Sequence, residues 1–600
     1  MFFCRCPRRF LRELLLSACA AGGLAGSAVF AAEISLSAPG ADEELRDTLV
    51  AASSVVEANA RGQEGVQELL AAALADYRTM VQVLYDAGYF APVVNIRLDG
   101  REAATIQPLT PPASISGIEI AVQPGPKFTF GKAVLAPLPA NSAVELPETY
   151  ATGRTATTGA IRDAAQAGRQ AWRQAGHAKV QVADLDITAD HLRARLDSEI
   201  LLAPGRQLRF GRMYVTGETA VREEVIRAIA GFPAGGQFHP DSLARVGSRL
   251  RRTGTFSSVT IREAQEANPD GTLDVTADFE DLPPRRLTFG AELSSSDGLE
   301  ITGSWMHRNL FGNAEKRLSG IGGDTDLDGR VAVRLDRPAT LGPDDNTFYL
   351  LEAERLDEEH YTASRGLGAF GVRRVYSDRL IGEASAGFES ILANDVFGKR
   401  RFKYITGRIR AEYERRNNRV SATDGYYIGA RAVPFLGIDG SKSGLQLRFD
   451  GRGYQRIAGN DRLVAAARVQ LGSVMGPSLN EVSPTYLFFS GGAGSVRGQE
   501  YQSLGVPANG GTAGGRGYLA LSGELRGAVS EKITLVGFYD IGFIDSEPFV
   551  SGDSSRHSGA GLGLRYDVAG IGPIRLDLAW PVSGGTEDGM QFYIGIGQAF

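Results

Sequence analysis

The chain has 600 residues, of which 43% are hydrophobic and 75 are glycine, and its formal net charge is −6 at pH 7. This mildly acidic balance makes it a poor candidate for binding nucleic acid. No run of about 18 apolar residues follows the N-terminal region, so no transmembrane helix is expected. Two classes fit: a large soluble multidomain protein, or a membrane β-barrel, whose strands are apolar on one side only.

Residues 1–31 are predicted to be a signal peptide. Four arginines precede an apolar run from Leu14 to Phe30, and cleavage is expected after Ala31. The alternative is a lipoprotein signal, because Leu16-Ser-Ala-Cys19 resembles a lipobox, but only about five apolar residues would precede its cysteine, fewer than an export signal needs. All three cysteines fall within this segment. The mature chain would have none, which excludes a disulfide framework and thiol chemistry.

Residues 33–283 contain an internal repeat. Pro124-Gly-Pro-Lys-Phe-Thr-Phe-Gly131 returns as Pro204-Gly-Arg-Gln-Leu-Arg-Phe-Gly211, and each copy leads into an apolar strand. Three helical patterns end at a glycine, at Gly88, Gly176 and Gly254, and a β-rich stretch follows each. These echoes predict three β-α-α-β-β modules of roughly 80 residues. An α+β region with coincidental similarity is the alternative.

From about Arg285 the helical period disappears and a period of two begins. Residues 445–450, for example, alternate Leu, Leu and Phe with Gln, Arg and Asp. The polar face carries charges of both signs, as the interior of a wide barrel would, and the apolar face would meet lipid. We expect sixteen strands. Short turns such as 309–312 would lie on one side, and longer loops such as 395–400 and 546–558 on the other.

A glycine-rich loop, Gly491–Gly505, lies between candidate strands eleven and twelve. It carries one cation, Arg497, which inside a barrel has to be paired or hydrated. A bidentate carboxylate is the favourable partner. Asp540 and Glu524 lie on following strands and should both face inward. A solvated arginine in an exposed loop is the alternative.

With these pieces placed, the chain resembles the superfamily of outer-membrane assembly factors that includes BamA and TamA, in which periplasmic POTRA modules precede a sixteen-stranded barrel. The turn Asn309-Leu-Phe-Gly312 resembles the family's first periplasmic turn. Val496-Arg497-Gly498 resembles the motif of a loop that folds back into the lumen, and Phe538-Tyr-Asp-Ile-Gly542 resembles the strand motif that receives its arginine. Gly572-Pro-Ile-Arg-Leu-Asp577 matches another late-strand signature.

The resemblance implies a fold class of α+β periplasmic POTRA repeats followed by an all-β, 16-stranded antiparallel transmembrane β-barrel. Three modules and this length are most like TamA. The implied domains are a signal peptide (1–31), POTRA 1 (32–124), POTRA 2 (125–204), POTRA 3 (205–283) and the outer-membrane barrel (284–600). The barrel would lie in the bacterial outer membrane and the modules in the periplasm. One departure is Gln499, which stands where the family has an aromatic residue.

The function implied by the resemblance is the insertion and secretion of autotransporter-type barrel proteins. The modules would dock unfolded clients or a TamB-like partner that spans the periplasm. Arg497, paired with Asp540 and near Glu524, would lock the loop in the lumen.

A lateral seam is the second site that the resemblance implies. It would lie between the first strand, about 287–295, and the last strand, which contains Gly595 and Gly597 and ends at Phe600. Glycine weakens strand pairing, and an opened seam would template client strands within outer-membrane lipid. The alternative is that these glycines only make room for the contents of the lumen.

An enzyme is not expected. The six histidines are scattered with no metal-ligand pair at helical spacing, and no cofactor motif is evident. Gly559-Ala-Gly-Leu-Gly563 superficially resembles a phosphate loop but lies in a strand pattern with no helix after it. The main alternative function is a two-partner secretion transporter that exports a single client.

Overall fold

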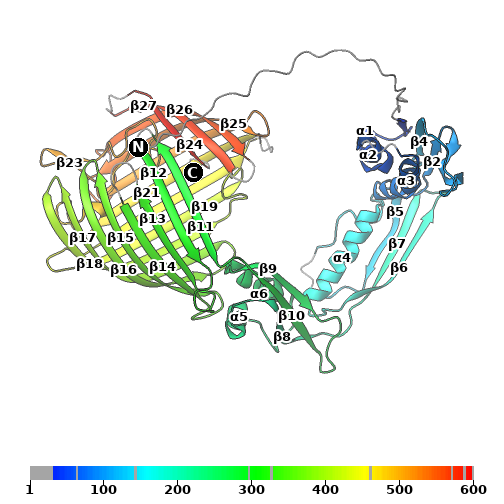
Figure 1. The fold of residues 1–600 in the computed structure, drawn as a ribbon, viewed down its shortest axis with the longest axis horizontal. Helices are drawn as coiled ribbons and strands as arrows, with labels where there is room; N and C mark the ends of the chain where they lie inside the picture. Colours follow the sequence, from blue (N-terminus) through cyan, green and yellow to red (C-terminus); the bar gives the residue numbers. More distant parts are fainter. Residues whose placement is uncertain are drawn as a thin grey trace, which may run out of the picture. The chain divides into compact units, whose positions relative to one another are not determined.

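The computed structural model describes residues 32–61, 65–140, 145–294, 298–323, 329–457, 462–568, 572–584 and 589–596. The predicted signal peptide therefore lies outside the described residues. The chain divides after Arg206 into two compact units, which are considered separately (Figure 1). Among the described residues, no helix is long and apolar enough to cross a membrane.

The first unit begins with a four-stranded sheet of order β1-β4-β2-β3. Side chains of Asp42 and Ser53 cap the first two helices, and buried Asp76 of the third helix accepts a 2.6 Å hydrogen bond from the Ser53 hydroxyl. The elements are β1 (Glu33–Ser37), α1 (Glu43–Ala52), α2 (Ser54–Ala60), α3 (Val66–Asp86), β2 (Val93–Leu98), β3 (Arg101–Glu102), the 3-10 helix η1 (Ala103–Thr105) and β4 (Gly117–Gln123).

A second sheet in this unit has the order β5-β7-β6 and one helix. Small residues of that helix, Ala160 and Ala164, are buried with Phe128 and Phe130 in a separate core. The elements are β5 (Thr129–Ala136), α4 (Thr158–Gln174), β6 (Gln181–Asp190) and β7 (Arg195–Ala203). Within the described ranges β6 pairs with β7 alone, so it is an edge strand.

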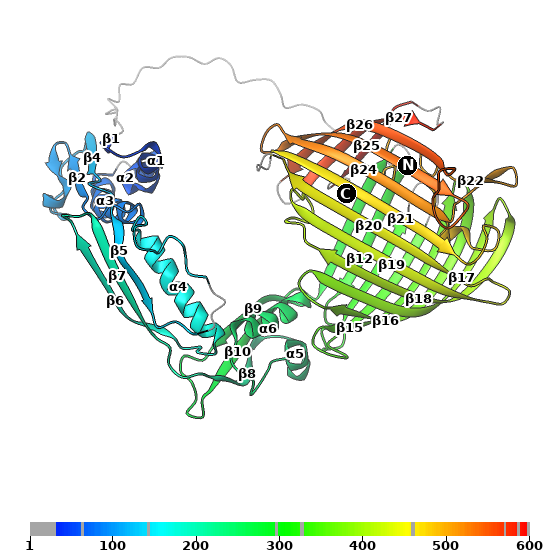
Figure 2. The same ribbon diagram turned by 180° about the vertical axis from the view of Figure 1, so that it is seen from behind.

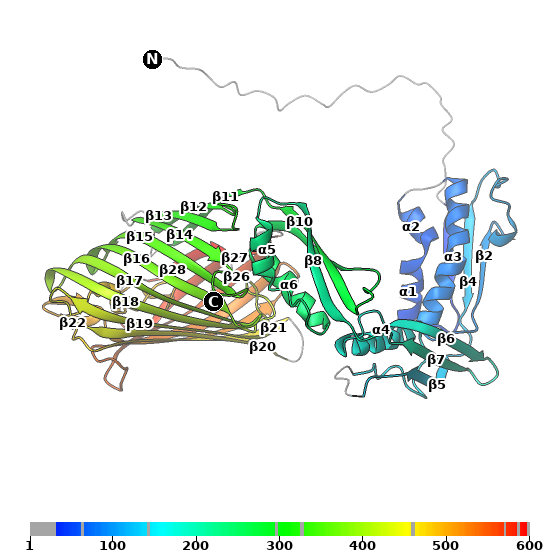
Figure 3. The same cartoon turned by 90° about the horizontal axis from the view of Figure 1, so that it is seen from below.

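The second unit opens with a sheet of order β8-β10-β9, and its two helices pack on that sheet (Figure 3). Both helices show the apolar period that the sequence predicts, and they bury Ile226, Ile229, Val246 and Leu250 in one core. The elements are β8 (Arg209–Glu218), α5 (Glu223–Ala230), α6 (Pro240–Arg252), β9 (Phe256–Glu263) and β10 (Thr272–Asp281).

The three α/β sheets depart in part from the expected β-α-α-β-β repeat. Only the third has that order; the first has three α-helices and four strands, and the second has one α-helix among its described residues. The extra helix arises because Ser53 ends α1 and caps α2, so two short helices stand where the β-α-α-β-β repeat has one. The predicted C-cap glycines Gly88, Gly176 and Gly254 are confirmed, with φ of +93°, +99° and +61°.

The remainder of the second unit is a sixteen-stranded antiparallel sheet that curls into a barrel (Figure 2). Each strand pairs with the next along the chain, and β24 follows β21 directly. The strands are β11 (Arg285–Ser294), β12 (Gly298–His307), β13 (Lys316–Gly323), β14 (Gly329–Pro338), β15 (Asp345–Glu358), β16 (Tyr361–Val375), β17 (Leu380–Asp395), β18 (Gly398–Glu414), β19 (Gly425–Ile438), β20 (Gly444–Arg456), β21 (Leu463–Met475), β24 (Gly517–Ala528), β25 (Ile533–Asp545), β26 (Ser555–Val568), β27 (Gly572–Ser583) and β28 (Gln591–Ile596).

The expected alternation of faces is present in these strands. On β27, Arg575, Asp577 and Ala579 are buried toward the lumen, whereas Leu578 and Trp580 are exposed on the outer surface. Outward apolar side chains recur on many other strands, including Phe289, Leu351, Ile405, Leu525 and Leu562. An apolar outer surface around a charged interior suits a lipid environment.

One expected long loop is instead a tight hairpin. Residues 395–400 were predicted as a connection, but Asp395 pairs with Gly398, which leaves two residues at the turn. The Asp395 carboxylate accepts a 2.9 Å hydrogen bond from the Phe397 amide, and Gly398 has φ +86°, so local turn chemistry closes the hairpin.

The third α/β sheet is joined to the rim of the barrel within the second unit. Arg249 and Arg252 of α6 form ion pairs of 2.7 and 2.9 Å with Asp344, in the connection between β14 and β15. The pKa of the Asp344 carboxyl lies below its ordinary value, chiefly because of the hydrogen bond from Arg249 and further because of the hydrogen bond from Arg252. Arg222 donates its amide to Gly312 of the turn after β12, at 3.0 Å. The two ion pairs of Arg249 and Arg252 with Asp344 are called the rim latch below.

Candidate lumen lock and seam

The segment between β21 and β24, residues 476–516, packs against the inner wall of the barrel through its residues 482–505, while its hairpin at residues 506–513 projects from the end of the barrel (Figure 2). Its aromatic side chains Tyr486 and Phe488 are buried in one cluster with Tyr404 and Phe435 of the wall. The Tyr486 hydroxyl donates a 2.6 Å hydrogen bond to the carboxylate of Glu389 on β17. The segment includes the 3-10 helix η2 (Pro484–Tyr486), β22 (Val506–Ala508) and β23 (Gly511–Ala513). Packing and hydrogen bonds therefore hold residues 482–505 against the inner wall.

Within this segment, the lumen loop Gly491–Gly505 buries Arg497, which is 2% exposed. Its Nε and Nη2 donate to the two carboxylate oxygens of Asp540 at 2.8 and 3.0 Å, which is bidentate geometry. Its Nη1 donates to Glu524 Oε1 at 2.7 Å and to Asp577 Oδ2 at 3.2 Å. The guanidinium carbon also lies 3.6 Å from the ring centroid of Phe538. One loop cation thus joins β24, β25 and β27.

Further arginines balance the three carboxylates. Arg526 forms a 2.7 Å ion pair with Glu524, and Arg565 forms an ion pair with Asp577. Asp540, by contrast, accepts hydrogen bonds only from Arg497 among the described residues, including one from the backbone amide at 3.2 Å. Asp540 is therefore the carboxylate that depends most on the loop.

Three glycines, two in the wall and one in the loop, let the loop backbone approach the wall closely. A Cβ atom on Gly559 of β26 would lie 1.9 Å from the carbonyl oxygen of Arg497, and one on Gly542 of β25 would lie 2.8 Å from a methyl carbon of Val496. Gly498 has φ +89°, and a Cβ there would meet the Trp580 carbonyl at 2.6 Å. Since glycine alone has no Cβ, these positions set how deeply the loop can sit.

Gln499 stands at the position where the family resemblance implies an aromatic residue, and its side chain links the loop to the barrel wall by hydrogen bonds. Its side chain is fully buried, and Nε2 donates to the carbonyl oxygens of Ser558 and Ser583 at 2.7 and 3.1 Å. The amide of Gly498 donates to the hydroxyl of Tyr593 on β28 at 3.1 Å. Hydrogen bonds in place of ring packing therefore attach the loop to β26, to β27 and to the last strand.

The first and last strands meet in two residue pairs among the described residues, Leu293 with Ile594 and Ser294 with Tyr593. On its other side, β11 pairs with β12 over all ten residues of each strand. Of the predicted seam residues, Gly595 lies in β28 opposite Arg575 of β27, whereas Gly597 and Phe600 lie outside the described residues. The described pairs thus place the junction of the first and last strands at Leu293 and Ser294.

The structure thus brings together the predicted residues Val496, Arg497, Gly498, Glu524 and Asp540, and it places the predicted seam residue Gly595 on the neighbouring last strand. The sequence did not single out Asp577 or Phe538 as site residues, although both lie in quoted strand motifs. Their inward register and their late position in the chain were the available signals. Among the described residues, no group of three or more His, Cys, Asp or Glu side chains is arranged to hold a metal ion.

Two hollows flank the wall below this loop. The larger, of about 830 Å³, lies between the loop and strands β18 to β21, and a second of about 320 Å³ lies beside the rim latch. Glu383 and Arg410 line both. The two hollows therefore share a stretch of charged wall.

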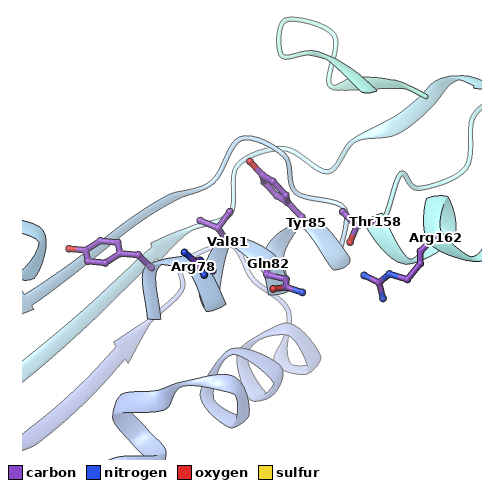
Figure 4. Close-up of a pocket in the computed structure, with 7 residues that line it drawn as sticks. Arg78, Val81, Gln82, Tyr85, Thr158 and Arg162 are labelled. Carbon is purple, nitrogen blue, oxygen red and sulfur yellow. The ribbon is translucent and has the colours of Figure 1, made fainter. Parts of the chain in front are cut away.

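The first unit has a hollow of its own, of about 500 Å³ (Figure 4). Its lining comes from two helices: Arg78, Val81 and Tyr85 of α3 among others, and Thr158 and Arg162 of α4. The Thr158 hydroxyl donates a hydrogen bond to Asp86, which joins the two helix ends. This open hollow combines aromatic and arginine side chains at the junction of the first two sheets.

Comparison with known families assigns part of the barrel. Residues 359–600 match the Omp85 superfamily domain. Outer envelope protein 80, chloroplastic, of Arabidopsis thaliana is 24% identical over 371 residues, which cover 56% of this chain and 48% of that protein. The match therefore spans about half the length of that relative.

Two solved structures are similar to this chain. BamA from Haemophilus ducreyi lacking POTRA domains 1–3 matches with a TM-score of 0.63 at 16% identity, covering 78% of this chain and 99% of that one. CdiB from Acinetobacter baumannii matches with a TM-score of 0.49 at 12% identity, covering 78% and 89%. The likeness to BamA shows a shared fold. The family match itself is confined to residues 359–600.

Proposed function

From the Omp85 superfamily domain at residues 359–600, we propose that this chain is an outer-membrane factor that assembles or translocates other barrel proteins, autotransporter-type clients among them. The junction of the first and last strands carries the proposal. Its described pairs are Leu293 with Ile594 and Ser294 with Tyr593. If these two strands separate, the exposed strand edge can pair with an incoming strand by β-augmentation, which would template a client strand.

The lumen loop supplies the control element of this proposal. Arg497 binds strands β24, β25 and β27, while Gly498 donates to Tyr593 on β28, which borders the seam. Release of the loop would therefore free the last strand from an interior anchor. We propose that the lock formed by Arg497, Asp540 and Glu524 sets how readily the seam opens.

The outward apolar side chains support placement of residues 284–600 in the outer membrane, with POTRA modules at 32–124, 125–204 and 205–283 in the periplasm, after a signal peptide at 1–31. The proposed docking edge for clients or a TamB-like periplasm-spanning partner is β6, an edge strand of ten residues with Leu185 and Ile187 exposed. Main-chain groups on such an edge accept an added strand. The hollow between α3 and α4, lined by Tyr85 and Arg162, offers a further contact for side chains of a partner of this unit.

The two hollows that share Glu383 and Arg410 favour a second candidate function. A two-partner secretion transporter would pass one client through the lumen, and hollows along the wall suit such a path. The two functions differ in where the client ends: in the membrane for an assembly factor, and beyond it for an exporter.

A cross-link across the seam tests the assembly function. Leu293 and Ile594 are directly paired, and Cα atoms in such pairs lie about 4.5–5.5 Å apart, within the range that a disulfide can bridge. The matched control is Leu293→Cys/Leu299→Cys. Leu293 and Leu299 are paired in the β11–β12 junction, where all ten residues of each strand are paired. Since all three native cysteines lie within residues 1–19, the mature chain offers no competing thiol.

The assay reconstitutes the double variant Leu293→Cys/Ile594→Cys in vesicles and measures the amount of a barrel client that becomes inserted and protease-resistant. Oxidation should abolish insertion and a reductant should restore it, whereas the control pair should insert client in both states. Full insertion with the seam cross-linked would contradict the assembly function. Client recovered inside the vesicle lumen instead of in the membrane would favour the exporter.

A further inference from the structure

A row of arginines crosses the inner wall of the barrel below the lumen loop. Arg410 on β18 is directly opposite Arg431 on β19, and Arg431 is directly opposite Arg448 on β20. All three line the cavity of about 830 Å³. Adjacent strands lie about 4.7–4.9 Å apart, so the row spans roughly 10 Å. Like charges directly opposite one another destabilise a sheet, so this arrangement calls for a compensating charge.

The described wall supplies that charge only in part. Arg410 pairs with Glu412 of its own strand, whereas Arg431 and Arg448 form no hydrogen bond or ion pair within the described residues. Arg448 instead lies over the ring of Phe488, 5.0 Å from its centroid. The centre of the row is therefore a pair of cations that no carboxylate of the described chain neutralises.

Nearby carboxylates are engaged elsewhere. Glu383 pairs with Arg334 at 3.2 Å. Asp450 binds both Arg452 and Arg468, at 2.6 and 2.9 Å. The third carboxylate that lines the cavity, Glu358, accepts a 2.8 Å hydrogen bond from Gln502. None of the three carboxylates forms an ion pair with Arg431 or Arg448 in the described part of the chain, so the centre of the row keeps an excess of positive charge.

The opposite side of the cavity is aromatic. Phe488 and Phe489 precede the lumen loop, Tyr501 lies in it, and Tyr518 begins β24; all four line the cavity. The volume falls within the range of small-molecule sites, which combine apolar walls with a few polar groups at fixed positions. A cationic wall that faces rings suits an anion attached to an organic group as well as a free one.

We propose that Arg410, Arg431 and Arg448 form a binding site for a phosphate-class oxyanion, either free or carried on a lipid headgroup. Guanidinium groups bind phosphate oxygens in bidentate geometry. A phosphate presents up to two negative charges at one point, which suits three cations within roughly 10 Å. An acidic peptide spreads single charges along its length and fits the compact row less well.

The test uses the full chain in detergent micelles and isothermal titration calorimetry with two probes, sodium pyrophosphate and the short-chain lipid dihexanoyl phosphatidic acid. We expect the wild type to bind at least one probe, and Arg431→Gln and Arg448→Gln to bind it at least tenfold more weakly. Arg431→Lys should retain part of the affinity. The matched control Arg419→Gln removes an arginine that pairs with Glu414 at 3.7 Å and does not line the cavity, and it should bind as the wild type does.

The two probes separate the sources of the anion. Tighter binding of pyrophosphate supports a free phosphate compound, and tighter binding of the lipid supports a headgroup. The proposal is overturned if the wild type binds neither probe, if Arg431→Gln keeps wild-type affinity, or if a hexaglutamate peptide binds where both phosphate probes do not. The heat-dependent shift in gel mobility typical of folded barrels checks each variant; should Arg431→Gln fail to fold, Arg431→Lys and Arg448→Gln decide the question.

Discussion

Replacing Arg497 with glutamine should release the lumen loop while leaving the barrel wall formed. The substitution removes a cation that contacts three buried carboxylates. Glu524 keeps its ion pair with Arg526, and Asp577 keeps that with Arg565. Asp540 loses its charged partner, because Arg497 is the one residue of the described chain that donates hydrogen bonds to it. The free-energy cost of the substitution therefore falls mainly on Asp540, whose buried carboxylate is left without a charged partner.

Breaking a buried ion pair by removing one partner costs about 3–5 kcal/mol, since an uncompensated charge stays behind. If that cost falls on the seated state of the loop, the free energy of loop opening drops by about the same amount. Each 1.4 kcal/mol corresponds to a factor of about ten, so exchange of the protected loop amides should accelerate by roughly two to three and a half orders of magnitude.

Hydrogen exchange followed by mass spectrometry over residues 491–505 measures this change, with peptides from β17 and β18 as internal references. The double variant Arg497→Gln/Asp540→Asn removes the orphaned charge as well, so its exchange should be slower than that of Arg497→Gln alone. Equal loop protection in the wild type and in Arg497→Gln would refute the assignment of Arg497 as the lock.

Two other perturbations test the loop seat and the rim latch. Gly559→Ala places a Cβ atom 1.9 Å from a backbone oxygen of the lumen loop and should speed its exchange, whereas Gly537→Ala on the neighbouring strand, with nothing within 4 Å, should not; equal behaviour of the two variants would contradict the close-approach argument. The pKa of Asp344 is depressed by hydrogen bonds from Arg249 and Arg252, so the latch contributes stability above the ordinary aspartate pKa of 3.8 and loses it as the pH falls through the depressed value. Thermal melts at pH 7 and pH 3 should therefore differ less for Asp344→Asn than for the wild type, and an unchanged difference would show that the latch is not responsible.

Most of the fold could be predicted from patterns within short stretches of the sequence. The period-two alternation, the strand count and the C-cap glycines are properties of neighbouring residues, so a single sequence reveals them. The helix break at Ser53 was missed, although a serine followed by a second apolar stretch is a cap signal. Here two short helices replace the one that the repeat implied.

The site was only partly predictable for a different reason. Arg497 needed an acidic partner on physical grounds, and Asp540 and Glu524 were the inward-facing candidates. The contact with Asp577 depends on how far around the barrel the loop reaches, and the row formed by Arg410, Arg431 and Arg448 depends on the register of three strands. Register across a barrel is set by long-range pairing, which no short stretch of sequence specifies.

The hydrogen bond from Gly498 to Tyr593 has a consequence for the order in which the protein is built. Its acceptor lies in β28, the last of the sixteen barrel strands, so the loop cannot complete its seat until that strand has been added. A protein stalled before β28 would leave the amide of Gly498 without this acceptor. Complete seating of Arg497 and its loop therefore depends on a completed barrel wall, and a barrel without β28 should have a loop that proteases cut more readily.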